Sequence, residues 1–168
     1  MDAEISEAGD RGRGAGIEKS FTRPGWLAVL AKAKVGELQA AWDALGDKPR
    51  YRVLRPAETG LVMLRGRIGG TGQPFNLGEM TMTRAAVQLL DLAGTAQQTG
   101  FGHVAGRSAR HAELVALLDA LLQDPARHEA ISTTVVAPLA ARQRAAKMNR
   151  AAKIMATKVD FFTMVRGE

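Results

Sequence analysis

Apolar residues recur at helical spacing near both ends of the chain. From Arg23 to Gly46 large apolar side chains follow one another at steps of three and four, with Pro24 suited to a first turn and Gly46 to a helix stop, which predicts a first helix. The helical period returns from Arg110 in the leucine-rich run HAELVALLDALLQD, which predicts a second helix.

A third helix is expected from Pro125 toward Lys158. Pro138 lies inside it and should kink or divide it, because the proline ring collides with the carbonyl group one turn earlier.

The middle of the chain changes to the period of two that is typical of strands. Four apolar runs are separated by Pro, Gly and Asn: YRVLRP, GLVMLRGRIGG, EMTMTRAAVQLL and GFGHVAGR. In the second run Val62 and Leu64 alternate with Met63 and Arg65. The pattern predicts an α+β fold, in which an N-terminal helix, an antiparallel sheet of three or four strands and two C-terminal helices precede an extended apolar arm.

The two ends differ in character. Residues 1–20 are charged, rich in glycine and poor in large apolar side chains, so we expect a disordered leader there. Residues 21–168 are expected to form a single domain that ends in an arm over residues 159–168.

Composition narrows the class of protein. The chain has 168 residues, no cysteine and a net charge of +6. Without cysteine a disulfide framework and thiolate metal sites are excluded, and no stretch approaches the roughly 20 apolar residues of a membrane span, so we expect a cytoplasmic protein without membrane contact.

Six bases and no acid lie between Glu129 and Asp160. This charge covers about half of the expected helix and has no aromatic platform, which disfavours nucleic-acid binding, although a basic nucleic-acid-binding protein remains a third alternative.

Arginines are the candidate binding groups of the sheet. Their planar forks bind phosphate or carboxylate, and the candidates for contact with an anionic substrate are Arg65, Arg67, Arg84 and Arg107. The alternative is that these arginines are solvated or paired with acids such as Glu58. Several arginines on one sheet face would strengthen the functional interpretation.

Two other motifs give weaker evidence for a functional site. RGRIGGTGQPFNLGE lacks the ending of a phosphate loop and predicts a wide turn between strands. His103, His111 and His128 do not have a metal-ligand spacing, so neither catalytic nor metal-binding residues are predicted.

Two apolar features predict contact with another chain. The third helix carries a seam of small residues and methionines at steps of three and four, formed by Pro138, Ala141, Ala145, Met148, Ala152, Met155 and Val159. The arm adds Val159, Phe161, Phe162, Met164 and Val165. The arm either docks on its own domain or crosses a subunit boundary, and so large an apolar end on a small domain favours the second. The partner-binding candidates are Met148, Met155 and the five arm residues.

A resemblance adds to this interpretation. The segments RPAETGLVMLRGRIGGTGQPFNLGEMTMTRAAVQL, GHVAGRSARHAELVALLDALLQ, VAPLAAR and TKVDFFTMVRGE together resemble the PhnG family, the G subunits of the bacterial carbon–phosphorus lyase core complex. They cover nearly everything after residue 20. The chain departs from the family pattern at Ser108, where an aspartate is usual, although a serine there still suits a helix cap.

The resemblance implies an auxiliary subunit that works with partners of the H, I and J types and most directly with the I type. In that family the complex forms α-D-ribose 1-methylphosphonate 5-triphosphate from ATP and methylphosphonate with loss of adenine, and a partner carries the catalytic centre. ATP is then a substrate of the complex, and no cofactor is expected on this chain alone. An alternative is that the chain supplies essential residues to a composite active site.

Overall fold

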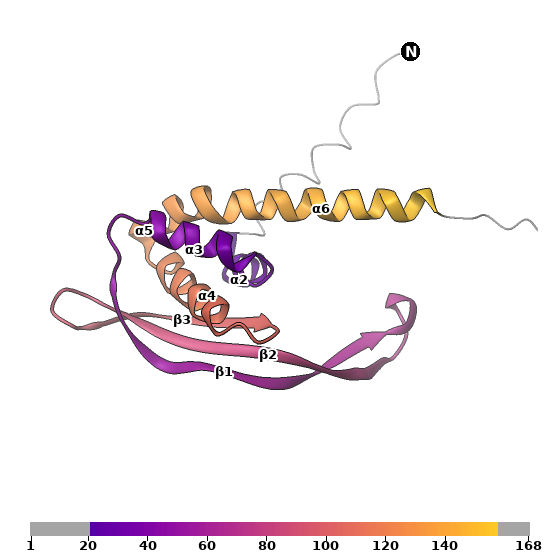
Figure 1. The fold of residues 1–168 in the computed structure, drawn as a ribbon, viewed down its shortest axis with the longest axis horizontal. Coiled ribbons are helices and arrows are strands. Elements are labelled where there is room, and N and C mark those ends of the chain that lie inside the picture. The colour runs from indigo at the N-terminus through magenta and orange to yellow at the C-terminus, as the bar shows by residue number, and fades with distance from the viewer. Residues whose placement is uncertain (1–20, 158–168) are drawn as a thin grey trace, which may run out of the picture.

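A three-stranded antiparallel sheet forms one layer of the protein, and every helix of the described chain lies on the same face of it (Figure 1). The computed structural model describes residues 21–157, so the predicted leader and the arm at 159–168 lie outside the described residues. The strands are β1 (Arg50–Arg67), β2 (Pro74–Leu90) and β3 (Ala96–Ala105), in the order β1-β2-β3. The predicted α+β class and antiparallel sheet are confirmed.

The four apolar runs of the sequence form three strands. The first two runs both belong to β1. Pro56 has no N–H group for the ladder, and the strand continues past it because bulges near residues 53–58 interrupt the regular pairing there. The glycine-rich segment is a hairpin turn, as predicted, with a short 3₁₀ turn at Ile68–Gly70 in which Gly69 and Gly70 have positive φ.

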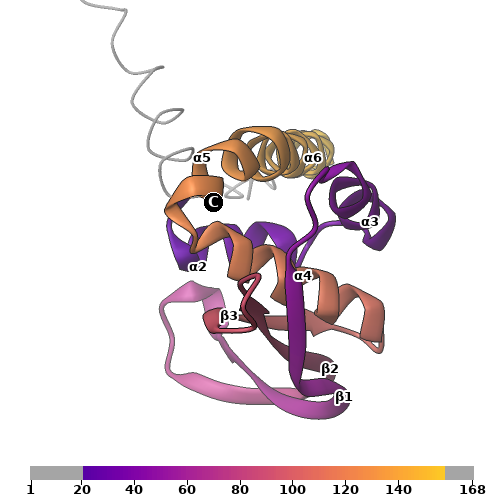
Figure 2. The ribbon, with the colours of Figure 1, turned by 90° about the vertical axis from the view of Figure 1, so that its left-hand side faces the viewer.

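The helix α4 (Ala109–Leu122) lies directly on the sheet and forms the centre of the core. Its backbone approaches β3 at Gly100 and Gly102, where an added Cβ would overlap the carbonyl oxygens of Ala116 and Ala112. Figure 2 shows α4 as a middle layer, with the sheet below it and the other helices above.

The first predicted helix is wrong in one respect, because the structure has two helices there, α2 (Arg23–Leu30) and α3 (Val35–Ala44). The Glu37 carboxylate accepts a hydrogen bond from the Lys34 backbone N–H at 3.0 Å, which starts a new helix. Leu30 and Leu38 are both buried on either side of the break, so the apolar pattern runs through it.

The third predicted helix is divided, as its proline indicated. It consists of α5 (Pro125–Ile131), a π-type turn at Ser132–Val136 and α6 (Ala137–Ala156), with Pro138 in the first turn of α6. The described part of the chain has no helix that is both long enough and apolar enough to span a membrane.

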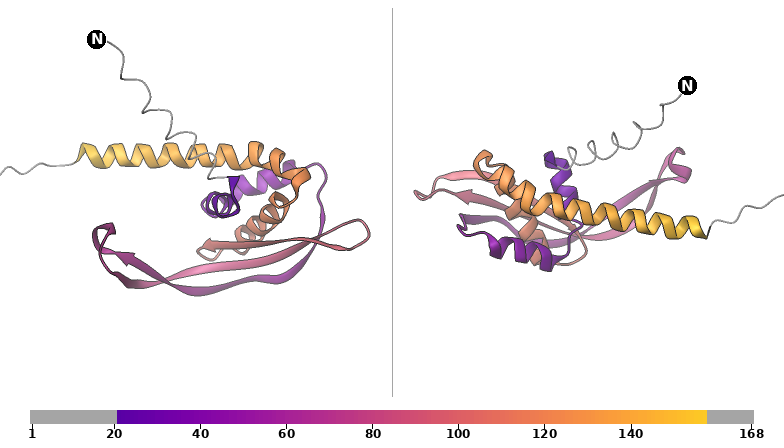
Figure 3. Two further views of the ribbon diagram at one scale, coloured as in Figure 1. Left: turned by 180° about the vertical axis from the view of Figure 1, so that it is seen from behind. Right: turned by 90° about the horizontal axis from the view of Figure 1, so that it is seen from above.

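Two long elements leave the body in the same direction. The hairpin of β1 and β2 continues past the end of β3, and α6 extends on the helix side of the molecule (Figures 1 and 3). We call residues 60–80 the distal hairpin.

Candidate functional site

A row of polar side chains crosses the sheet on the face turned away from α4, which we call the outer face. The strand register places Glu58, Arg84 and His103 opposite one another on three successive strands. Arg84 Nε donates to Glu58 Oε1 at 2.6 Å, and Arg55 Nη1 donates to the same oxygen at 3.0 Å. The hydrogen bond and charge of Arg84 are the main reason that the pKa of Glu58 lies below its ordinary value, with a smaller contribution from Arg55.

The outer face carries more positive charge than this row alone. Arg50 and Arg52 lie on the same face as Arg84, according to the register, and Arg52 donates from Nε and Nη2 to the side-chain oxygen of Gln88 at 3.0 and 2.6 Å. Arg55 joins them through Glu58. Four arginines therefore share one sheet face with a single glutamate between them, which is the condition that strengthens the anion-binding interpretation.

An open pocket adjoins the row. It has a volume of about 470 Å³ and is lined by Glu58, Thr59, Gly60, Leu61, Val62, Met82, Arg84 and His103. The Nε of Arg84 is already taken by Glu58, so an anion would meet the remaining guanidinium N–H groups.

The structure separates the four nominated arginines. Arg84 lies at the centre of the sheet, whereas Arg65 and Arg67 lie near the hairpin turn, where Arg67 Nη1 donates to the carbonyl oxygen of Gly72 at 3.1 Å. Arg107 follows the end of β3 and is exposed. The group that the fold brings together is instead Arg50, Arg52, Arg55 and Arg84, because strand pairing and not proximity in sequence decides which side chains meet.

A second polar cluster is buried and structural. Asp119 of α4 is fully buried and accepts hydrogen bonds from Arg23 Nη2 and Trp26 Nε1, both at 2.8 Å, and from the Phe101 backbone N–H at 3.0 Å. The apolar pattern alone does not predict this cluster, although an aspartate inside the leucine run LLDALL is a usable signal for it.

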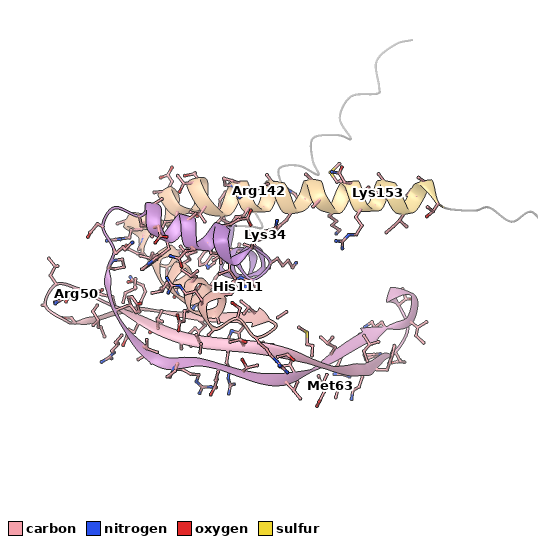
Figure 4. All side chains as sticks on the ribbon, viewed as in Figure 1. Lys34, Arg50, Met63, His111, Arg142 and Lys153 are labelled. Carbon is pink, nitrogen blue, oxygen red and sulfur yellow. The ribbon has the colours of Figure 1, made fainter. Side chains whose placement is uncertain are left out.

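His111 also belongs to the core. It lies in α4 beside α2 (Figure 4), and its Nε2 is 3.2 Å from the backbone oxygen of Leu30. Within residues 21–157, His, Asp and Glu side chains do not form a group of three that could hold a metal ion.

The distal hairpin is uncovered. Beyond β3 it has neither a third strand nor a helix against it in the described chain, and large apolar side chains stand in water, among them Leu61 (64% exposed), Leu77 (62% exposed) and Met63. Figure 4 shows Met63 on this part of the hairpin, far from Arg50 at the other end of β1. So much exposed apolar surface in one region indicates a contact with another chain.

The far part of α6 is uncovered as well. Its first turns hold it to the body, where Leu139 and Ala140 are buried, Gln143 Nε2 donates to the Val29 oxygen at 2.9 Å, and Arg142 pairs with Glu37 at 3.1 Å. From residue 145 to residue 157 every side chain is exposed. Figure 4 shows Lys153 on the part of α6 that has left the body.

The predicted seam lies on the side of α6 opposite these contacts. At about 100° per residue, Ala141 and Met148 project about 180° away from Leu139. Pro138, Ala141, Ala145, Met148, Ala152 and Met155 are all exposed, so the seam is not used within the described chain. The other partner-binding candidates, Val159, Phe161, Phe162, Met164 and Val165, lie outside the described residues.

Comparison with known proteins decides the family. The family model described as phosphonate metabolism protein PhnG matches residues 21–167. The chain belongs to the PhnG family. A curated member from Rhizobium meliloti (strain 1021), named alpha-D-ribose 1-methylphosphonate 5-triphosphate synthase subunit PhnG, is 47% identical over 142 residues, which are 84% of this chain and 87% of the relative.

The PhnG match covers both kinds of surface described above. It includes the outer face with its arginines, the distal hairpin and the whole of α6. The resemblance noted from the sequence segments is thereby confirmed. The candidate site consists of two kinds of exposed surface, the arginine-rich outer face and the apolar surfaces of the distal hairpin and α6.

Proposed function

We propose that this chain is the PhnG-type subunit of an enzyme complex that forms α-D-ribose 1-methylphosphonate 5-triphosphate. It serves there as an auxiliary subunit that binds and shapes a catalytic partner. The name of the Rhizobium meliloti relative and the family match support the place in the complex. We further propose that its partners are subunits of the H, I and J types, with the I type in direct contact, that ATP is a substrate of the complex, and that the complex works in the cytoplasm.

One observation carries the auxiliary role. The distal hairpin and the last three turns of α6 expose large apolar side chains that the described chain leaves uncovered, among them Leu61, Leu77, Met148 and Met155. Fully burying one such side chain contributes about 1.5–3 kcal/mol, so these elements are suited to a partner surface and costly to leave in water. Chemistry at a ribose carbon also needs groups that bind anions, and on the outer face the described residues group arginines suited to that task.

A second candidate function rests on those arginines. Arg50, Arg52, Arg55 and Arg84 share the outer face, so the chain could supply part of an anion-binding wall to a composite active site. In that case the pocket beside Arg84 opens toward the catalytic partner. Nucleic-acid binding draws only on the net charge of +6 and is disfavoured.

The test is reconstitution of the complex from co-expressed subunits, with assembly and product formation measured separately. We expect the partners without this chain to form little product and to recover when it is added. Removing the segment from Val159 onward should abolish co-purification if the arm crosses a subunit boundary. Normal assembly of the truncated chain would mean that the arm is not the contact.

Single arginine variants separate the two functions. Arg84→Ala, Arg65→Ala and Arg67→Ala should all assemble if the subunit is auxiliary, and turnover should change less than threefold. Turnover lost with assembly intact in Arg84→Ala, but not in Arg67→Ala, would favour the composite site. A salt-sensitive gel shift on plain duplex DNA would instead support nucleic-acid binding.

A further inference from the structure

The two edges of the sheet differ in how their backbone groups are satisfied. At the β3 edge, side chains from the helices form hydrogen bonds with backbone groups of the strand. Gln123 Nε2 and Arg23 Nη2 donate to the Thr99 oxygen at 2.8 and 3.3 Å, and Asp119 Oδ2 accepts from the Phe101 N–H at 3.0 Å. The outward groups in the middle of β3 are therefore occupied, so a further strand could not pair along the whole of this edge, which we call the closed edge.

The β1 edge is open. Within residues 21–157, β2 is the only strand that pairs with β1, and side chains do not bond to its backbone. An unpaired row of N–H and C=O groups is a template for another chain. Between residues 53 and 58 bulges and Pro56 disrupt the row, which leaves the stretch from Glu58 to Leu64 as the regular part.

The side chains of this stretch fit burial on both faces. Leu61, Val62, Met63 and Leu64 are consecutive, so they project alternately to the two sides of the sheet. A strand with one wet face alternates apolar and polar residues, whereas a strand covered on both faces is continuously apolar. The free edge and the apolar faces therefore coincide at the same residues.

Charge identifies the kind of strand that fits. Two copies of β1 paired antiparallel about Leu61 would place Arg67 of one copy opposite Arg55 of the other at both ends of the pairing, and like charges on adjacent strands repel. A second copy is therefore a poor occupant. An apolar strand with Asp or Glu at the end that meets Arg65 and Arg67 is a good one.

We propose that the β1 edge from Glu58 to Leu64 accepts an extended segment of a different subunit as a fourth strand of the sheet, apolar in the middle and acidic at one end. This inference rests on the proposed function, because it names how the partner is held. Main-chain hydrogen bonds would supply the affinity, and the apolar side chains of both faces the selectivity.

Hydrogen exchange in the assembled wild-type complex is the first test. β2 can protect only every second backbone amide between Glu58 and Leu64, since alternate residues of an edge strand point their N–H groups outward. We expect the remaining amides to exchange at least a hundredfold more slowly in the complex than unstructured amides do. If half of the amides stay fast, the edge is free and the proposal is overturned.

Proline variants supply the matched test. We would compare Leu61→Pro, Val62→Pro, Met63→Pro and Leu64→Pro with alanine at the same positions. Two of the four proline variants, at alternate positions, remove an N–H group that points outward from the sheet. These two variants should stay folded but reduce co-purification more than tenfold, while the alanine variants reduce it less than threefold. Equal losses for proline and alanine would mean that the side-chain faces bind and the edge does not.

Two further outcomes identify a wrong occupant. If removal of residues 158–168 from this chain makes the outward amides fast while assembly persists, its own end occupies the edge. If the edge is paired in a homodimer without partners, a second copy does. Either result overturns the proposal but leaves the proposed function standing, whereas failure of the wild-type chain to assemble with any partner would refute the function itself.

Discussion

The indole N–H of Trp26 donates to Asp119 Oδ1 at 2.8 Å, and this bond joins α2 to α4 in the buried core. The other carboxylate oxygen accepts from Arg23 Nη2 at 2.8 Å and from the Phe101 N–H at 3.0 Å. One carboxylate thus connects a helix of the upper layer, the central helix and the closed edge of the sheet. Because this core contact occupies the β3 edge, β1 is the edge of the sheet that stays open.

Asp119→Ala should destabilise the chain strongly. It removes the partner of the half-exposed Arg23 and leaves the Trp26 indole and the Phe101 N–H without their acceptor, and each buried donor left unsatisfied costs about 1–3 kcal/mol. Denaturant unfolding followed by tryptophan fluorescence measures the loss. Asp43→Ala, at an exposed carboxylate paired with Lys48 at 3.6 Å, should change stability by about 0.5 kcal/mol or less, and a similar loss in both variants would contradict a special role for Asp119.

Gly102→Ala should also destabilise the fold. An added Cβ would overlap the carbonyl oxygen of Ala112, so α4 would have to move away from β3, at a cost of about 1–3 kcal/mol or more. Gly36→Ala is the matched control, because nothing lies within 4 Å of its added Cβ and it lies in α3. Alanine there should stabilise by up to about 1 kcal/mol. The two melting temperatures should therefore shift in opposite directions.

Much of this fold could be predicted from the sequence because local patterns decide it. The leucine run of α4, the strand alternation around Val62 and the division of the last helix near Pro138 all depend on residues close together in the chain. The break between α2 and α3 was missed because it depends on one capping contact of Glu37 inside an apolar pattern that continues through it.

The site was harder to predict because it depends on strand register. Arg84 was nominated together with Arg65 and Arg67, but its neighbours on the outer face are Arg52 and Arg55. Two bulges in β1 set which residues stand opposite β2, and the sequence does not display them. What covers the exposed surfaces depends on partner chains. A single sequence indicates such a contact only through apolar residues that its own fold does not bury.

Glu58 should titrate below the ordinary range of a glutamate. Its pKa is lowered first by the hydrogen bond and charge of Arg84, so Arg84→Ala should raise that pKa part of the way back, since Arg55 remains. Because the pKa is lower in the folded than in the unfolded chain, the stabilisation is present above the unfolded value of about 4.3 and is lost as the pH falls through the folded value. Titration of the side-chain carbon by NMR measures the shift, with Arg52→Ala as a control that should leave it unchanged.

The seam of α6 should matter for assembly and not for folding. Met148 and Met155 are 72% and 65% exposed and lie on the side of α6 turned away from the body. The double variant Met148→Glu with Met155→Glu should therefore change the free energy of unfolding by about 0.5 kcal/mol or less, but place two carboxylates in the partner contact and prevent co-purification. Melting curves and pull-down from co-expressed subunits measure the two effects.

Two exposed apolar residues outside the seam serve as controls for it, one in a distant turn and one on another side of α6. Leu92→Glu, in the turn between β2 and β3, should assemble normally, because that turn is remote from both extended elements. Ile154→Glu lies on the other side of α6, about 100° from Met155. If Ile154→Glu prevents assembly while the seam variant does not, the partner lies between α6 and the distal hairpin, and the side of α6 assigned to the contact is wrong.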